Sequence, residues 1–358
     1  MGDPRNGSGQ PLRVVQWATG YVGMHSLKKI IQNPNLELAG VYVFSESKDG
    51  KDAGELCGLP PTGVKTTRSI DDILSLKADC VVYMQEGANY DDICRILESG
   101  ANIVTTRSEF HYGAKMDPEI RTRIEAACQR GDSSIHSTGS SPGFITEALP
   151  IVLTSIQQRV DSILIDEFAN MVDGCSPFML FETMGYGKPL SSFDERRLGM
   201  VKAGFAHSLE LLADALGKPI DSIEAKAEVA AARIPIEVPG PGGGVIQPGT
   251  LAAERVTISA MHKGQPFVTF RANWYCSKDI DADWPLRDVG WRVQVAGDAP
   301  LNVEIHFPIP KENMFDVLCG YTAHRPLNAI RAVCAAPAGL VSTMDLPQII
   351  ADVGATKA

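Results

Sequence analysis

The chain has 358 residues, of which 44% are hydrophobic and 21% charged, so it is long enough to bury the cores of two domains. Its 33 lysines and arginines are outnumbered by 43 aspartates and glutamates, which gives a formal net charge of −10 at pH 7. A surface this acidic repels phosphate backbones and anionic lipids, so nucleic acid and membranes are poor partners. No apolar run approaches the roughly 18 residues that span a bilayer, and residues 1–10 lack a signal-peptide core, so we expect a cytoplasmic protein.

Cysteine and histidine spacing argues against a metal site. The 8 cysteines include no C-x-x-C pair, so we expect reduced thiols and neither a disulfide framework nor a zinc knuckle. The 7 histidines show neither H-E-x-x-H nor H-x₃-H spacing. The sequence therefore predicts chemistry that needs no bound metal.

From Arg13 to about Pro142, short β-branched runs alternate with amphipathic stretches. This alternation predicts an α/β fold with a doubly wound parallel sheet. Asp117 is a candidate N-cap with Pro118 in the first turn, while Gly100 and Gly131 are expected after the last turns of their helices. The expected strands are Arg13–Trp17, Leu36–Phe44, Val64–Thr67, Asp79–Met84, Asn102–Thr106 and Ser133–Ser137, and the expected helices are Met24–Gln32, Asp91–Glu98 and Pro118–Arg130.

After Gly143, consecutive strand patterns are joined by short turns such as Lys263-Gly264 and Gly297-Asp298. They predict a second, α+β domain with an antiparallel or mixed sheet. The Gly/Pro-rich segment Pro239–Gly249 is interpreted as a surface loop, with a lid over the active site as the alternative. The expected strands are Ser162–Asn170, Ala225–Val238, Leu251–His262, Pro266–Cys276, Gly290–Val295 and Leu301–Phe307, and the expected helices are Phe144–Gln158, Phe193–Leu216 and Arg325–Ala335.

A glycine turn joins the first expected strand to the first expected helix. There, backbone N–H groups and the positive helix end can bind a pyrophosphate; Gly20 lets the backbone approach the phosphates and Gly23 lets the helix pack on the strand. Ala18 replaces the first glycine of G-x-G-x-x-G, so the match is partial. Because the turn opens an alternating α/β pattern, we predict dinucleotide binding by Ala18, Thr19, Gly20, Tyr21, Val22 and Gly23.

The residues after the second strand bear on the choice between NAD and NADP. NAD enzymes carry an acid there that holds the ribose 2′-hydroxyl. Here Ser45, Ser47 and Lys48 suit a 2′-phosphate, whereas Glu46 suits the free ribose, and a plain polar turn is the alternative. We predict that NADP is the preferred cofactor and NAD a second one.

These patterns divide the chain into four expected segments. Residues 1–11 form a leader outside the fold, 12–143 the dinucleotide-binding Rossmann domain, 144–320 an α+β domain for substrate and dimerisation, and 321–358 a helical segment that packs back on the Rossmann domain. The alternation in Leu251–Cys276 leaves one sheet face to be covered, so we predict at least a homodimer.

Four motifs resemble a known family. They are VVQWATGYVG (residues 14–23), SESKDGKDAGEL (45–56), TGSSPGF (138–144) and NAIRAVCAAPAGL (328–340). The chain resembles the dihydrodipicolinate-reductase-like superfamily over about Leu12 to Ile350, and within it most the 2,4-diaminopentanoate dehydrogenases and native amine dehydrogenases. Ile165–Met171 lacks the histidine pair and lysine of dihydrodipicolinate reductase proper, which favours the amine dehydrogenase branch.

The resemblance implies a catalytic residue. Glu109 follows the strand ending at Thr106, and ligands bind beyond the carboxyl ends of parallel strands. The resembling amine dehydrogenases carry a catalytic glutamate in this segment, so Glu109 is implied as acid/base and iminium stabiliser, with an exposed loop glutamate as the alternative. Asp166 and Glu167 are second choices.

Other candidate residues come from the end of the expected Rossmann domain and from the second domain. Gly139 and Pro142 are expected at the cofactor, or at a hinge between the domains. Core packing or another structural role is the alternative for the substrate-pocket candidates. These candidates are Phe144, Phe168, Asn170, Met171, Phe178 and His262.

The activity implied is that of an NAD(P)-dependent amine dehydrogenase. It would deaminate a small amine oxidatively, or aminate a small ketone or aldehyde reductively with ammonia. One alternative is reduction of a C=N or C=O bond in another small substrate, as in the parent superfamily. The other is a redox sensor that binds NAD(P)H without turnover.

Overall fold

A computed structural model of the chain describes residues 10–193 and 195–353. Contacts divide it into two compact units, one of residues 1–144 with 319–358 and one of residues 145–318. Residues 1–9 of the expected leader lie outside the described residues.

Unit 1 is built on a seven-stranded sheet with the order β15-β6-β5-β4-β1-β2-β3, in which every pair of neighbours is parallel. The predicted doubly wound parallel sheet is thus confirmed. The strands are β1 (Leu12–Trp17), β2 (Leu36–Tyr42), β3 (Thr66–Thr67), β4 (Cys80–Tyr83), β5 (Asn102–Thr105), β6 (Ser134–Ser137) and β15 (Gly339–Val341).

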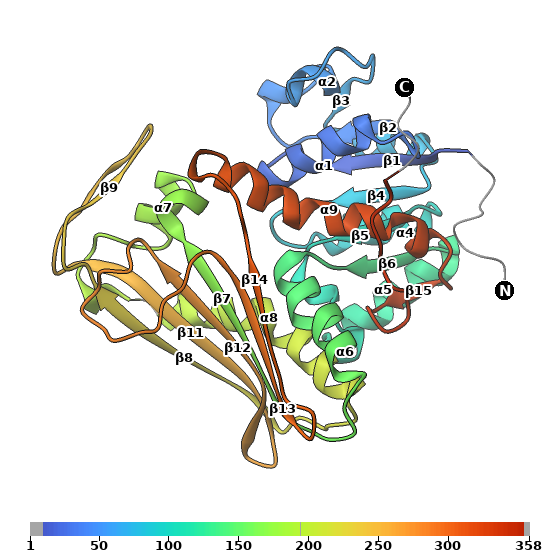
Figure 1. Cartoon of the computed structure of the whole chain (residues 1–358). Helices are drawn as coiled ribbons and strands as arrows, with labels where there is room; N and C mark the ends of the chain where they lie inside the picture. Colours follow the sequence, from blue (N-terminus) through green and yellow to red (C-terminus); the bar gives the residue numbers. More distant parts are fainter. Residues whose placement is uncertain (1–9, 194, 354–358) are drawn as a thin grey trace. The chain divides into compact units, whose positions relative to one another are not determined.

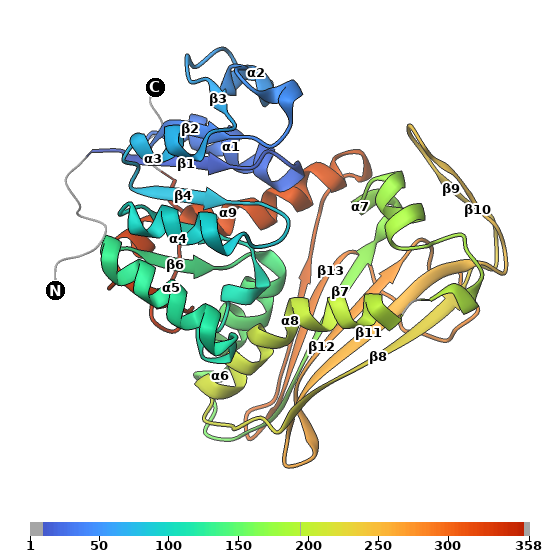
Figure 2. The same cartoon turned by 180° about the vertical axis from the view of Figure 1, so that it is seen from behind.

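Helices cover both faces of this sheet (Figures 1 and 2). Because side chains alternate along β1, Val14 packs with α1 and α9, whereas Val15 packs with α3, α4 and α5 on the other face. Residues 36–42 between α1 and α3 supply the second strand. The helices are α1 (Tyr21–Gln32), α2 (Ala53–Leu56), α3 (Ile70–Ser75), α4 (Tyr90–Glu98), α5 (Pro118–Gly131) and α9 (Met314–Cys334).

The end of α5 and the start of α9 differ from the sequence prediction. The left-handed cap of α5 is Asp132, with φ +51°, and not Gly131. Gly131 is the last residue of the helix. It must be a glycine because a Cβ there would lie 1.8 Å from the carbonyl oxygen of Leu97 at the end of α4. The C-terminal helix begins at Met314, well before the expected Arg325, and contains Pro326.

Unit 2 is built on a six-stranded sheet with the order β14-β13-β7-β12-β11-β8. Only the β7–β12 pair is parallel, so the predicted mixed sheet is confirmed. The strands are β7 (Val160–Asn170), β8 (Ser222–Ala231), β11 (Leu251–His262), β12 (Gln265–Tyr275), β13 (Gly290–Gly297) and β14 (Leu301–His306), and the helices are α6 (Leu149–Thr154), α7 (Met171–Gly174) and α8 (Glu195–Ala215).

The long helix α8 packs against one face of this sheet, as Figure 2 shows. Phe205 of α8 stacks on Phe270 of β12, with ring centroids 4.0 Å apart. Since neighbouring residues point to opposite faces, Arg271 lies on the face away from α8. The two faces of the sheet therefore carry different chemistry.

The segment Pro239–Gly249 is not a structureless loop. It contains β10 (Gly244–Ile246), which pairs antiparallel with β9 (Ile236–Val238). The expected long strand Ala225–Val238 is correspondingly broken after Ala231. Val238 and Ile246 are buried, so the hairpin is anchored by two apolar side chains that its many glycines and prolines obscured in the sequence.

Candidate active site

The glycine turn of unit 1 has the geometry of an anion-binding helix start. Helix α1 begins at Tyr21 with Gly20 as its N-cap, and no side chain caps it. A Cβ on Gly23 would lie 2.3 Å from the carbonyl oxygen of Ala18, whereas one on Gly20 would meet nothing within 4 Å. The helix thus packs closely on the turn, and its first N–H groups, with no capping side chain, suit a pyrophosphate.

Polar side chains after β2 lie beside this turn. The Lys48 Nζ donates hydrogen bonds to the carbonyl oxygen of Thr19 at 2.8 Å and to its Oγ1 at 3.2 Å. The Ser45 and Ser47 hydroxyls are 2.6 Å apart. The structure therefore brings the predicted Lys48 to the predicted turn.

Sequence reasoning missed Arg68. This residue follows β3, which pairs in parallel with β2, so its backbone reaches the same sheet edge as Ser45. The Arg68 Nη1 lies 3.0 Å from Glu46 Oε1, so the acid that would favour NAD is engaged by a cation. A basic residue directly after the third strand was the available signal.

Glu109 lies just beyond the carboxyl end of β5, in the single turn η3 (Ser108–Phe110). The Arg107 Nη2 donates to its Oε1 at 2.8 Å, and the Ser108 hydroxyl donates to its Oε2 at 3.3 Å. Burial alone would raise the pKa of Glu109, but hydrogen bonds from Arg107, its own backbone N–H and Ser108, together with the charge of Arg107, lower it. Its side chain remains 28% exposed, so an ionised carboxylate is available at this edge.

The buried Nε of Arg107 has no hydrogen-bond partner among the described residues. Such an unsatisfied buried donor is uncommon, and it lies on the residue that orients Glu109.

The TGSSPGF turn of unit 1 is tied to α9. The Arg325 Nε donates to Thr138 Oγ1 at 2.9 Å, and the Arg325 guanidinium lies 5.6 Å from the centre of the Phe144 ring. Gly143 has φ +117°, and a Cβ there would lie 2.7 Å from the Thr138 hydroxyl. Gly139 accepts a hydrogen bond from the backbone N–H of Phe144 at 2.8 Å, which together with Pro142 closes the turn.

The pocket candidates in unit 2 do not form one group. Phe168 is a core residue, and Asn170 caps α7 by accepting a hydrogen bond from the backbone N–H of Val172 at 3.1 Å. Met171 packs at the edge of the same core, whereas Phe178 is 72% exposed. His262 lies at the β11–β12 turn, the opposite end of the sheet from Asn170, so the structure does not bring it together with the others.

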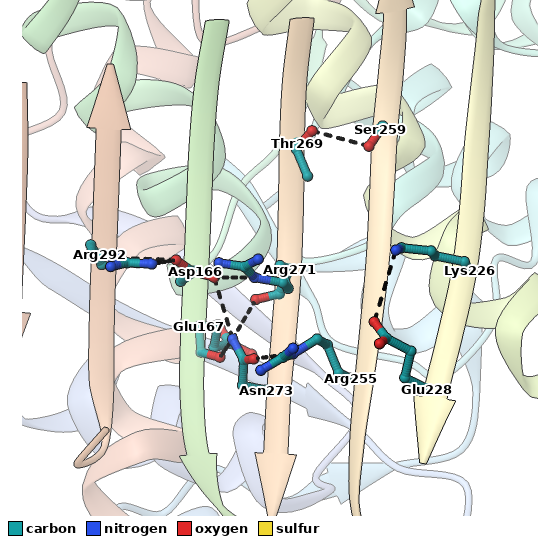
Figure 3. Close-up of polar contacts among 10 residues, drawn as sticks. All are labelled: Asp166, Glu167, Lys226, Glu228, Arg255, Ser259, Thr269, Arg271, Asn273 and Arg292. Carbon is teal, nitrogen blue, oxygen red and sulfur yellow. Dashed lines mark hydrogen bonds and ion pairs between the residues drawn. The ribbon is translucent and has the colours of Figure 1, made fainter. Parts of the chain in front are cut away.

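Asp166 lies on the face of the sheet away from α8, and it is fully buried (Figure 3). Arg271 Nε donates to its Oδ1 at 2.5 Å, and Arg292 Nε donates to its Oδ2 at 3.0 Å. Asn273 donates to the same carboxylate at 3.4 Å and accepts from Arg255 at 3.0 Å. Because this network engages both carboxylate oxygens, we exclude Asp166 as a second-choice acid/base group.

Several absences bear on the chemistry within residues 10–193 and 195–353. No group of three or more His, Cys, Asp or Glu side chains is placed to hold a metal ion there. None of the 8 cysteines, all of which lie in these ranges, forms a disulfide. None of the helices in these ranges is long and apolar enough to cross a membrane.

Several known proteins are similar to this chain in sequence or in fold. An amine dehydrogenase from Streptomyces virginiae is 27% identical over 352 residues, covering 94% of this chain and 96% of that protein. A 2,4-diaminopentanoate dehydrogenase from Acetoanaerobium sticklandii is 28% identical over 158 residues, 42% of this chain and 44% of that protein. The solved structure of an amine dehydrogenase from Mycobacterium smegmatis has a TM-score of 0.78 at 18% identity, covering 97% of this chain and 99% of that chain.

The parallel sheet and the glycine turn define a Rossmann-type nucleotide-binding domain. The amine dehydrogenase and 2,4-diaminopentanoate dehydrogenase relatives indicate an oxidoreductase that acts on CH–NH2 donors. The family described as the 2,4-diaminopentanoate dehydrogenase C-terminal domain matches residues 144–358, more than half of the chain. The chain belongs to the 2,4-diaminopentanoate dehydrogenase family, an amine dehydrogenase group of enzymes, and the resemblance seen in its motifs is confirmed.

Proposed function

We propose that the chain is an NAD(P)-dependent amine dehydrogenase that interconverts a small amine with a ketone or aldehyde and ammonia. The observation that carries this proposal is the ionised, partly exposed carboxylate of Glu109 at the carboxyl edge of the sheet that also bears the glycine turn. In this proposal unit 1 holds the cofactor, and unit 2 is the substrate and dimerisation domain.

The residues present fit a nicotinamide dinucleotide. Gly20 and the first N–H groups of α1 would hold the pyrophosphate, and Thr19, Ser45, Ser47 and Lys48 would hold the adenosine ribose. When bound, this cofactor supplies the hydride acceptor or donor, which the side chains of the chain do not. We propose NADP as the preferred form and NAD as the second.

Glu109 would act on the substrate amine. Only a deprotonated amine can release a hydride from its carbon, and a carboxylate within hydrogen-bond reach accepts the ammonium proton. Once the carbon–nitrogen double bond forms, the iminium carries a positive charge that the ionised Glu109 stabilises. Arg107 orients that carboxylate and lowers its pKa. Stabilisation of the iminium charge is therefore the larger part of the role of Glu109.

Omitting ammonia tests this function directly. Reduction of a ketone or aldehyde should oxidise NAD(P)H only when ammonia is present, because the iminium cannot form without it. Turnover without ammonia would instead identify the enzyme as a reductase of a C=N or C=O bond. Cofactor binding without turnover of any amine or carbonyl would identify a redox sensor.

We expect NADP(H) to bind more tightly than NAD(H), and Lys48→Ala to weaken NADP(H) binding by about tenfold, the usual scale of one charge-assisted contact. The Lys48 ammonium already lies 2.8 Å from Thr19 in the turn, so it is placed to reach a 2′-phosphate. Fluorescence titration of both cofactors measures this, with Lys51→Ala, another cation after β2, as the control. Equal or tighter binding of NAD(H) by the wild type would contradict the prediction.

Replacing Arg107 should move the pH dependence of catalysis. The folded-state pKa of Glu109 is lowered, so the ionised form persists as the pH falls. Arg107→Ala removes the side-chain donor and the positive charge, so the pKa should rise and the acidic limb of kcat/KM should shift to higher pH. Arg121→Ala, which breaks a surface pair with Glu125, is the control. An unmoved limb would show that Glu109 does not titrate in catalysis.

We also propose a cytoplasmic homodimer that pairs through the face of the unit 2 sheet away from α8. The polar network around Asp166 lies on that face, and an uncovered sheet face commonly pairs with its copy. None of the 8 cysteines in the described residues forms a disulfide, as expected of a protein in a reducing compartment. Light scattering at micromolar concentration should give at least twice the chain mass, and a monomer mass would end this proposal.

A further inference from the structure

Arg68 lies beside the segment that follows β2, on the side away from the glycine turn. In the sheet of unit 1, β2 lies between β1 and β3. The residues after β2 are therefore flanked by the turn that follows β1 and by Arg68, which follows β3. The backbone N–H of Val43 donates to the carbonyl oxygen of Thr67 at 2.9 Å, and Ser69 caps α3. The backbone on both sides of Arg68 is thus held in place.

The side chain of Arg68 has a partner that it can exchange. Its Nη1 lies 3.0 Å from Glu46 Oε1, and 44% of the Arg68 side chain and 85% of the Glu46 side chain are exposed. Among the described residues, Glu46 is the only side chain that pairs with Arg68. Exposed ion pairs contribute little to stability, because water solvates both charges when they separate. Arg68 can therefore leave Glu46 for another anion at small cost.

A second cation and two hydroxyls belong to the same group of side chains. Lys48 reaches the glycine turn, where its Nζ donates to the carbonyl oxygen of Thr19 at 2.8 Å. The hydroxyls of Ser45 and Ser47 lie 2.6 Å apart in the segment between the two cations. A phosphate monoester carries up to about two negative charges near pH 7, and a guanidinium can hold two of its oxygens at once. This group therefore suits a phosphate on the adenosine ribose.

Glu46 offers a second arrangement, for a ribose without that phosphate. Arg68 engages Oε1 of Glu46, and in the described part of the chain Oε2 has no hydrogen-bond partner. In NAD enzymes a carboxylate after the second strand accepts a hydrogen bond from the ribose 2′-hydroxyl. With NAD the ion pair can remain closed, whereas with NADP the same carboxylate would lie beside a phosphate of like charge. The two cofactors therefore require different states of the ion pair.

We propose that Arg68 discriminates between the two cofactors by exchanging Glu46 for the 2′-phosphate of NADP. The proposal rests on the proposed NAD(P)-dependent function and deepens it, because it assigns the cofactor preference to one ion pair. When NADP binds, Arg68 and Lys48 hold the phosphate, and Glu46 is left to solvent. When NAD binds, Arg68 stays on Glu46, whose second oxygen accepts from the 2′-hydroxyl. Arg68 is thus a specificity residue of unit 1, and it makes no contact with the reacting atoms.

Calorimetric titration of the full chain with NADP+ and with NAD+ tests this exchange. Arg68→Ala should weaken NADP+ binding at least about tenfold, the scale of one charge-assisted contact. The same variant should bind NAD+ at least as tightly as the wild type, because Glu46 keeps its carboxylate. Glu46→Gln should shift the ratio of the two affinities toward NADP+ by about threefold, since the phosphate loses a nearby like charge.

Arg95→Ala is the matched control. Arg95 pairs with Asp71, and the exposed fractions of their side chains, 44% and 81%, are close to those of Arg68 and Glu46. This pair lies on α4 and α3, away from the segment after β2. Its loss should leave the ratio of the two affinities within about twofold of the wild type.

Two fragments of the cofactor locate the effect at the ribose. Adenosine 2′,5′-bisphosphate and adenosine 5′-monophosphate carry the ribose with and without its 2′-phosphate, and both lack the nicotinamide. Arg68→Ala should reduce the preference for the bisphosphate by about tenfold as well. An unchanged ratio in Arg68→Ala would overturn the proposal, as would an equal loss of NADP+ and NAD+ binding, which would indicate a structural role.

The proposed function fails separately. Absence of turnover with any amine would refute the dehydrogenase and leave the response of the affinity ratio to Arg68→Ala intact. The test depends on the change in this ratio, so a wild type that binds NAD+ as tightly as NADP+ would contradict the predicted preference and not the exchange. Binding of neither cofactor by the wild type would overturn both proposals.

Discussion

Glu109→Gln is expected to lower the rate of amine oxidation by about 10² to 10⁴, or roughly 3 to 5 kcal/mol of activation free energy. Glutamine keeps the shape of the side chain and can still accept from Arg107 at the position of Oε1. It loses the negative charge that would stabilise the iminium and the basic oxygen that would take the ammonium proton. The effect should appear in kcat and in kcat/KM, because both functions act in the transition state.

Cofactor affinity decides how this result is interpreted. The glycine turn follows β1 and Glu109 follows β5, and these strands are separated in the sheet by β4, so the pyrophosphate contacts should not depend on Glu109. NADP(H) should therefore bind to Glu109→Gln within about twofold of the wild type. The matched control is Glu125→Gln, which removes the charge of an exposed glutamate paired with Arg121 and should keep full activity. A folded, cofactor-binding Glu109→Gln enzyme that retains more than about a tenth of the rate would exclude the carboxylate as an acid/base group.

Asp166→Ala should lower the free energy of unfolding by about 3 to 5 kcal/mol. Asp166 is fully buried, and its carboxylate holds both Arg271 and Arg292, whose side chains are themselves mostly covered. Removing it leaves two like charges, on the two strands that flank β7, without their shared partner. Urea unfolding followed by tryptophan fluorescence measures the change, at one fixed chain concentration because the proposed dimer would make stability concentration-dependent.

Asp161→Ala is the control for that experiment. Asp161 lies on the same strand β7 and also pairs with an arginine, Arg159, at 3.0 Å, but both side chains are more than half exposed. Exposed pairs of this kind contribute about 0 to 1 kcal/mol. If the free energy of unfolding falls equally in the two variants, the buried ion pairs of Asp166 contribute no more to stability than the exposed pair of Asp161.

Both sheets could be predicted from the sequence because their strands are long or repeat regularly. Strands β7, β11 and β12 have 11, 12 and 11 residues, and their alternation outweighs local exceptions. Strand β15 has only three residues, Gly339–Val341, in an Ala/Gly/Pro-rich stretch, so no period could reveal it. Local patterns also cannot show that this strand pairs with β6, some 200 residues earlier.

The positions of the candidate site residues could be predicted where they depend on neighbours in sequence. Gly20, Gly23 and Glu109 follow directly from strand ends, and the structure places them at the carboxyl edge of one sheet. The distinction between Asp166 and Glu167 could not be predicted. Alternation puts these adjacent residues on opposite faces, but the arginines that hold Asp166 and the two tryptophan indoles that donate to Glu167 lie more than 100 residues away in the chain.

The C-terminal residues complete a unit that the N-terminal residues begin. Strand β15 adds the last strand to the parallel sheet, and α9 covers the apolar face of Val14 and Ile30. During synthesis, the first 144 residues emerge without that cover, and unit 2 follows in full before residues 319–358 become available. Unit 2 can therefore fold as an inserted domain while the nucleotide-binding unit still lacks its last helix. Emergence of residues 319–358, and not of the glycine turn, thus sets the earliest moment at which the complete nucleotide-binding unit can form and be stabilised by cofactor.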